Sequence, residues 1–411
     1  MTDDPVRLTR FMLINPDYRE KPDALLKDLR EESPISRDEK ARTFLLTRFR
    51  DIRAVLRNHS LWRSPDKAEP SPAMQRLIDD TFVTDPQTGK LRSMSIVQMD
   101  NPDHERVRKP LAEALYARVA KARPLIETVV DETLDALEGR EGFDVLTDFA
   151  IPIPIDAIGA VLGVDRARRD EFREWSEGAV LYLKPARTPE ENAYREGAMA
   201  SLHDYFNELM AARRANPQDD LITDMVTLQS EGAEITDDEL RTNLLTLLTA
   251  GNLTTSDLIG NGVHLLLTHP EELAKLKADP ELIGQAVEEI LRYEPPNEAA
   301  FRIASQDMEV AGCPVAKTQS MTCLLRAANR DPEQFEDPDR FNITRARKPH
   351  ITFGGGVHLC LGAPLARAEA QIAYPKLFER FPNLRLANPQ EAPKKRVLPF
   401  LNGFETLQVL V

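Results

Sequence analysis

The sequence predicts a mainly α-helical protein with a minor β portion, and three observations support this fold class. Apolar residues recur at helical spacing over most of the chain, and Pro and Gly interrupt them between segments. One helical pattern, from Thr236 to Thr268, would span about 48 Å and could cross a whole domain. Stretches with strand character are short, and the clearest are residues 43–47, 307–310, 321–325 and 406–411.

Composition limits the class of protein. No Gly/Ser linker, low-complexity tract or internal repeat marks a boundary, so residues 1–411 are expected to form a single domain. The net charge of −14 argues against a nucleic-acid partner, because phosphate binding requires a basic face. The three cysteines, Cys313, Cys323 and Cys360, favour a reducing compartment over a disulfide scaffold. Neither a secretory leader nor a run of 18 apolar residues is evident, so we expect a cytoplasmic protein without a membrane span.

The long helical pattern has a defined start and an unusual centre. Thr236 and Glu239 form a capping box, and His269 followed by Pro270 ends the pattern. A central Gly251 costs about 1 kcal/mol relative to Ala, which indicates a kink or a close approach by a ligand. One helix face carries Leu247, Ala250, Gly251, Thr254 and Leu258.

A glycine-rich stretch, Phe353 to Gly362, contains Cys360 and precedes a helix-forming run that starts near Pro364. Cys360 is therefore expected at the start of a helix, where the helix dipole favours the thiolate. A thiolate on such a loop is a soft metal ligand, and haem iron is one of its known targets. Taken on its own, this cysteine would be interpreted first as a buried structural residue.

The complete pattern, Phe353-x-x-Gly356-x-His358-x-Cys360-x-Gly362, resembles the haem-binding loop of the cytochrome P450 family. The resemblance implies the family fold, with a long central helix over haem b (iron protoporphyrin IX). It also implies that Cys360 is the axial ligand of the haem iron and that Phe353 belongs to the cofactor site.

Further motifs extend the resemblance to the cofactor's carboxylates. His104 and Arg108 lie four residues apart, so they share one face of a helix that Asn101 and Pro102 would begin. Without other information, this pair would be solvated surface. The resemblance implies instead that it binds the haem propionates, together with Arg302 and His358.

The centre of the long helix matches the family pattern with one departure. Ala250, Gly251 and Thr254 match, which implies that the first two lie at the cofactor and that Thr254 assists oxygen activation. Leu253 stands where the family has an acid that relays protons, and a leucine cannot do so. Our hypothesis is that protons arrive through Asn252, water or Asp257. The ordinary interpretation of Thr254 is a helix threonine that bonds back to the Ala250 carbonyl.

Other segments are given structural or substrate roles by the same resemblance. Glu289, Arg292 and Arg340 would form a buried structural network. Residues 68–99 lack a regular pattern and would form part of the roof over the substrate. Candidate pocket residues are Leu247, Leu253, Glu298, Ala299, Ala300 and Phe400, of which Glu298 could contact a polar or cationic group.

The implied activity is that of a haem-thiolate monooxygenase, which inserts one oxygen atom of O2 into a small, largely apolar organic substrate. No dinucleotide fingerprint is evident, so electrons would come from NAD(P)H through a separate ferredoxin and ferredoxin reductase. A basic dock for an acidic ferredoxin could include Arg106, Lys109, Arg345, Arg347, Lys348 and Arg367.

Three alternatives remain open from the sequence. Leu253 motivates a haem-thiolate enzyme of altered chemistry, such as peroxide-driven oxidation, dehydrogenation or oxidative coupling. A haem-binding sensor or carrier without turnover would carry the same cofactor motifs. A helical protein that binds no haem would require all these motifs to coincide by chance.

Overall fold

The computed structural model describes residues 18, 22–39, 41–84, 89–184 and 186–411. Their contacts divide the chain into two compact units. Unit 1 comprises Met1–Thr81, Thr268–Cys360 and Lys394–Gly403. Unit 2 comprises Phe82–Leu267, Leu361–Pro393 and Phe404–Val411. Each unit therefore contains segments that are far apart in the sequence.

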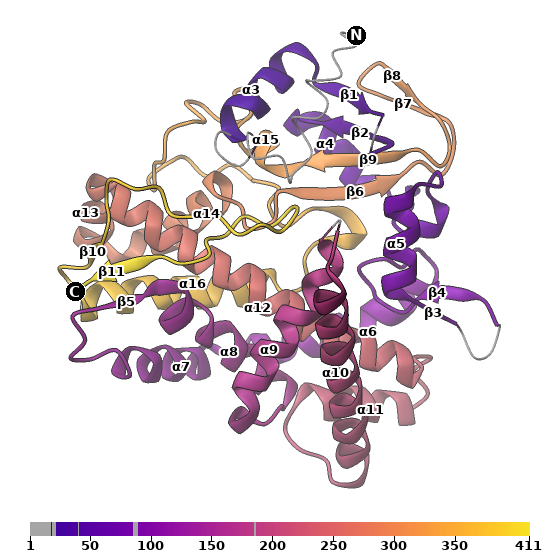
Figure 1. Cartoon of the computed structure of the whole chain (residues 1–411), viewed down its shortest axis with the longest axis horizontal. Helices are drawn as coiled ribbons and strands as arrows, with labels where there is room; N and C mark the ends of the chain where they lie inside the picture. Colours follow the sequence, from indigo (N-terminus) through magenta and orange to yellow (C-terminus); the bar gives the residue numbers. More distant parts are fainter. Residues whose placement is uncertain (1–17, 19–21, 40, 85–88, 185) are drawn as a thin grey trace. The chain divides into compact units, whose positions relative to one another are not determined.

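Unit 1 is built on a four-stranded sheet of order β1-β2-β9-β6, whose strands come from both ends of the unit's sequence (Figure 1). Strand β2 pairs antiparallel with β1 and parallel with β9, and β9 pairs antiparallel with β6. A hairpin, β7-β8, extends from the unit. The strands are β1 (Ile35–Asp38), β2 (Thr43–Leu46), β6 (Ala299–Ile303), β7 (Met308–Val310), β8 (Cys313–Val315) and β9 (Ser320–Leu324).

The core of unit 1 lies between this sheet and the helices beside it. Phe44, Leu46 and Met321 of the sheet pack with Phe49 and Ile52 of α4. The helices are α3 (Pro22–Glu32), α4 (Phe49–Arg57), α5 (Pro72–Thr81), α13 (Pro270–Ala278), α14 (Ile283–Tyr293) and α15 (Leu325–Asn329).

Unit 2 is mostly helical. Its long helix α12 (Asp237–Thr268) contacts α16 (Ala363–Arg380) very closely, since a Cβ on Gly262 would lie 2.0 Å from the Tyr374 hydroxyl. The other helices are α6 (Asp103–Val119), α7 (Arg123–Asp135), α8 (Pro152–Leu162), α9 (Arg169–Ala179), α10 (Pro189–Ala215) and α11 (Leu221–Ser230). The strands are β3 (Phe82–Thr84), β4 (Leu91–Ser93), β5 (Gly142–Asp144), β10 (Arg385–Leu386) and β11 (Gln408–Leu410).

Several of these elements agree with the sequence predictions. The long helix is confirmed, together with its capping box, in which Thr236 and Glu239 exchange backbone and side-chain hydrogen bonds. The four predicted strands correspond to β2, β7, β9 and β11. The helix after Pro102 begins at Asp103, but Asn101 is not its cap, because Pro102 occupies that position.

The expectation of an irregular stretch at residues 68–99 is wrong in part. This stretch contains α5 and the paired strands β3 and β4, and residues 85–88 lie outside the described residues. The two strands were missed because they are three residues long and gain their stability from pairing with each other.

Among the residues that the structure describes, one segment, Val145–Leu162, is long and apolar enough by composition to cross a membrane. Most of it is buried inside the protein, as in the core helix of a globular fold.

Candidate active site

The glycine-rich loop of unit 1 has a backbone that only glycine readily adopts. Gly354 and Gly356 have φ values of +74° and +68°. A Cβ on Gly356 would lie 2.2 Å from the carbonyl oxygen of Leu56, so α4 packs directly against the loop backbone. The loop closes when the Cys360 N–H donates to the Phe353 carbonyl at 3.0 Å. Cys360 is exposed, so its sulfur is accessible to a ligand and the alternative of a buried structural cysteine is wrong.

The strand that lies beside this loop supplies a buried cation. Arg302 in β6 is 3% exposed and donates to the Gly355 carbonyl at 3.1 Å. His358 lies within the loop, in a short 3-10 turn at residues 356–358, and is half-buried. Unit 1 therefore holds Cys360, Arg302 and His358 on one loop and its neighbouring strand.

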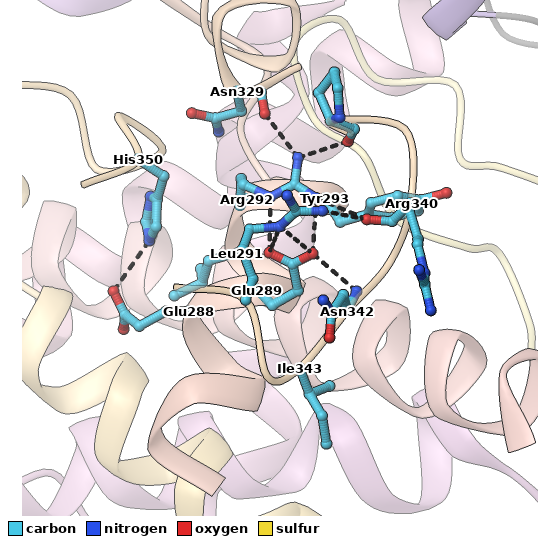
Figure 2. A network of polar contacts seen from close by, with 12 residues as sticks. Glu288, Glu289, Leu291, Arg292, Tyr293, Asn329, Arg340, Asn342, Ile343 and His350 are labelled. Atoms are coloured by element: carbon cyan, nitrogen blue, oxygen red, sulfur yellow. Dashed lines mark hydrogen bonds and ion pairs between the residues drawn. The ribbon is translucent and has the colours of Figure 1, made fainter. Parts of the chain in front are cut away.

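A hydrogen-bond network fixes the start of the loop to α14 and α15. The Asn329 side chain accepts from the Ile351 N–H at 3.0 Å and donates to the Thr352 hydroxyl at 2.8 Å. The Thr352 hydroxyl in turn donates to the Leu291 carbonyl at 2.7 Å. His350 is 3.1 Å from Glu288 (Figure 2). These contacts give the loop the rigidity that a ligand site requires.

The same network includes the predicted pair of α14. Arg292 donates two hydrogen bonds of 2.8 Å to Glu289, and both residues are buried. Arg292 also donates to the Asn329 carbonyl at 2.9 Å (Figure 2). The Glu289–Arg292 pair is thereby connected through Asn329 to the segment that leads into the Cys360 loop.

The third member of this network differs from the prediction. Arg340 contributes its backbone carbonyl to Arg292, and in Figure 2 its side chain points away from the Glu289 carboxylate. Arg345 supplies the side chain instead, with its Nε 3.1 Å from one carboxylate oxygen of Glu289. The sequence analysis placed Arg345 in a surface dock, because no local pattern indicates that its side chain reaches Glu289.

Glu298 also has a different environment from the one predicted. It is 6% exposed, accepts from the Arg326 guanidinium at 3.1 Å and lies 3.3 Å from the Tyr18 hydroxyl. Burial raises the pKa of Glu298, and Arg326 opposes that rise only in part. These contacts make Glu298 a member of an internal ion network with Arg326, Asp23 and Glu294, so we do not retain it as a substrate contact.

The neighbouring pocket candidates of unit 1 do lie together. Phe400 and Phe301 make an edge-to-face contact with ring centroids 4.7 Å apart. The Glu298 N–H donates to the Phe400 carbonyl, which joins the turn at 399–403 to the start of β6. Ala299 is buried and Ala300 is half-buried.

In unit 2, α12 has a partly exposed stripe at its centre. Ala250 is exposed, whereas Asn252 and Asp257 are buried. The Thr254 hydroxyl donates to the Ala250 carbonyl at 2.8 Å, which confirms the ordinary interpretation of its own hydrogen bond. The oxygen of that hydroxyl keeps lone pairs through which it can accept a hydrogen bond. The half-buried positions of the stripe are Leu247, Gly251, Leu253 and Thr254.

The predicted cationic pair of α6 also lies in unit 2. His104 is 2% exposed, and Arg108, one turn later, is half-buried. Arg106, which we expected in a surface dock, instead donates to Glu239 at the start of α12 at 2.6 Å. This contact raises the pKa of Arg106. Because Arg106 pairs with Glu239 and Arg345 pairs with Glu289, we do not retain either arginine as a dock residue.

The sequence of this chain is similar to those of known proteins. The family model described as cytochrome P450 matches residues 77–405. Cytochrome P450 107B1 of Saccharopolyspora erythraea is 37% identical over 89% of this chain and 88% of its own length. The polyketide biosynthesis cytochrome P450 PksS of Bacillus subtilis is 34% identical over 96% of each chain.

Solved structures agree in fold. The myxobacterial cytochrome P450 CYP267B1 in complex with myristic acid superposes with a TM-score of 0.87 at 34% identity, covering 97% of this chain and 98% of that chain. P450BioI in complex with an acyl carrier protein that carries hexadec-9Z-enoic acid gives a TM-score of 0.85 at 32% identity, covering 96% and 99%. The mainly helical fold with small sheets is therefore confirmed.

Proposed function

This chain belongs to the cytochrome P450 family and is a P450 monooxygenase, and on that premise we propose how its own residues serve that activity. The family implies haem. We propose Cys360 as the axial ligand of the haem iron, with Phe353, Ala250 and Gly251 at the cofactor. The observation that carries this proposal is the rigid glycine loop with an accessible Cys360.

The residues present fit this cofactor. The exposed Cys360, on a constrained loop, can serve as a soft sulfur ligand of iron. The guanidinium of Arg302 can bind a carboxylate. We propose that Arg302, His358, His104 and Arg108 bind the haem propionates. When bound, haem supplies the activation of O2 and the transfer of one oxygen atom to the substrate.

Around the cofactor, the side chains of α12 would control protons and water. We propose that Thr254 accepts a hydrogen bond through its free lone pairs and orders water during oxygen activation. Leu253 excludes water at the usual acid position and cannot deliver a proton. Asp257, buried one turn from Thr254, remains our candidate for the proton route, together with Asn252.

We propose a small, largely apolar organic substrate, because the half-buried residues among the predicted substrate contacts are apolar in both units. Leu247, Leu253, Ala300 and Phe400 support this class. Similar solved structures contain ligands of this kind, namely CYP267B1 with myristic acid and CYP109E1 with testosterone. A carrier-bound acyl chain is a second candidate, because the P450BioI structure includes an acyl carrier protein.

We propose further that residues 1–411 act as one catalytic domain in the cytoplasm. Electrons would reach it from NAD(P)H through a ferredoxin and a ferredoxin reductase. Of the basic residues expected in a dock, Lys109, Arg347 and Lys348 are exposed and Arg367 is half-buried, so these four remain candidates.

The proposal is tested by the absorption spectrum of the purified protein, reduced and exposed to carbon monoxide. Wild type should show the strongly red-shifted Soret band of a thiolate-ligated haem, and Cys360→Ala should lack it. Haem without that band in wild type would mean another axial ligand, and the monooxygenase mechanism would fail. With the band present, spin-state titrations with a fatty acid, a steroid and a carrier-bound acyl chain would define the substrate.

A further inference from the structure

We propose that Arg63, a residue to which no role has been assigned above, is a second arginine of unit 1 that binds a cofactor carboxylate, next to Arg302. The inference rests on the proposed function, because the carboxylates concerned are the propionates of the haem.

Backbone pairing places the two residues side by side. Trp62 and Ile303 form an antiparallel bridge in which each N–H donates to the other's carbonyl, at 2.9 and 2.8 Å. In an antiparallel pair, the residue after Trp62 lies beside the residue before Ile303. These two residues are Arg63 and Arg302.

The side chains converge as well. Nη1 of Arg63 and Nη1 of Arg302 each donate to the carbonyl oxygen of Phe301 at 2.8 Å. The two nitrogens are therefore no farther apart than twice that distance. Both guanidinium groups also lie close enough to the buried Cys323 thiol to favour its thiolate, although burial prevails and raises its pKa to about 12.

Two like charges at this separation repel each other. Arg302 is buried and Arg63 is half-buried, so water screens the repulsion only in part. An anion shared by the two guanidiniums would convert the repulsion into two charge-assisted hydrogen bonds.

The position of the pair identifies the anion. Arg302 donates through Nη2 to the Gly355 carbonyl, so the guanidinium pair adjoins the loop that carries Cys360. The guanidinium fork matches a carboxylate in geometry, and the carboxylates that haem presents are its two propionates. We therefore assign Arg63 to the propionate next to Arg302, which no motif of the sequence indicated.

The test uses the holoprotein and two readouts. Arg63→Gln should release haem to apomyoglobin about tenfold faster than wild type, the effect expected from losing one charge-assisted hydrogen bond. It should also shift the propionate bending band in the resonance Raman spectrum. Arg63→Lys, which keeps the charge, should show a smaller effect on haem release. The control, Arg53→Gln, removes the same charge from an exposed position of α4 and should change neither readout.

Three outcomes are distinguishable. Unchanged haem release in Arg63→Gln would overturn the assignment of Arg63. Faster release with an unmoved propionate band would also overturn it, because the residue would then act only by supporting β6 through the Phe301 carbonyl. A wild-type protein that lacks the thiolate-ligated haem spectrum would instead overturn the proposed function itself.

Discussion

Glu369 shows how a single buried residue can set the pH dependence of stability. It lies in α16 with 1% exposure, and its Oε1 has no hydrogen-bond partner among the described residues. Burial raises the pKa of Glu369 well above the ordinary value of a glutamate. Between the ordinary pKa of a glutamate and this raised pKa, the carboxyl is therefore protonated in the folded protein but ionised in the unfolded chain.

From this we predict the effect of Glu369→Gln. Between the unfolded and folded pKa values the folded state binds the extra proton, so the stability of wild type falls as pH rises. The glutamine variant has no such pH dependence. Above pH 4.5, its free energy of unfolding should therefore rise relative to that of wild type by up to about 1.4 kcal/mol per pH unit. Denaturant unfolding of the holoprotein between pH 5 and 8 measures the difference.

Glu379→Gln is the matched control, because Glu379 is exposed on the same helix. It should leave the pH dependence of unfolding as it is in wild type. If the free energies of unfolding of Glu369→Gln and wild type differ by the same amount at every pH, Glu369 is ionised in the folded protein and the prediction is wrong.

Single residues also mark the limit of what the sequence could predict. Cys360 and Thr254 could be named as candidates because short motifs fix their local spacing. Glu298 was misassigned because its partner Arg326 comes from another segment, and no local pattern reveals that pairing. Arg63 escaped notice for the same reason, since its relation to Arg302 depends on the bridge between Trp62 and Ile303.

At the scale of elements, helices were easier to predict than strands. Helix α12 has a capping box and a long apolar period, both of which are local signals. Strand β6, Ala-Ala-Phe-Arg-Ile, has no clear alternation and contains a buried arginine. It forms because β9 pairs with it in an antiparallel register from Ala299 opposite Leu324 to Ile303 opposite Ser320. Such pairing is a property of the folded chain.

Two arginines that follow α14 in the chain should differ in their effect on stability. Arg345→Ala removes a cation that is 14% exposed and contacts Glu289, and it should lower the free energy of unfolding by about 3–5 kcal/mol. Arg340→Ala keeps the backbone carbonyl that contacts Arg292, and its exposed side chain should matter by less than about 0.5 kcal/mol.

Urea unfolding of the two holoprotein variants compares them directly, and haem content should fall only in Arg345→Ala. If Arg340→Ala lowered the free energy of unfolding as much as Arg345→Ala or more, the sequence-based assignment of Arg340 to the network would be correct. The reason for expecting otherwise is geometric: the guanidinium of Arg345 contacts Glu289, whereas Arg340 contacts Arg292 through its backbone carbonyl.

For the molecule as a whole, electrostatics should govern the encounter with the proposed ferredoxin. The net charge of −14 repels an acidic partner at long range, whereas the exposed Arg347 and Lys348 attract it at short range. The Debye length falls from about 30 Å at 0.01 M salt to about 10 Å at 0.1 M. Salt should therefore first remove the long-range repulsion and then weaken the short-range attraction.

We predict that the rate of haem reduction by a reduced, acidic [2Fe–2S] ferredoxin passes through a maximum as salt increases. Stopped-flow reduction under carbon monoxide measures this rate. Lys348→Glu should lower the maximum several-fold, whereas Lys27→Glu, an identical charge change on the exposed face of α3, should leave it near wild type. The two variants have equal net charge, so the long-range repulsion is the same in both and only the local attraction differs. Equal rates in the two variants would mean that net charge alone governs the encounter, and Lys348 would then have no part in docking.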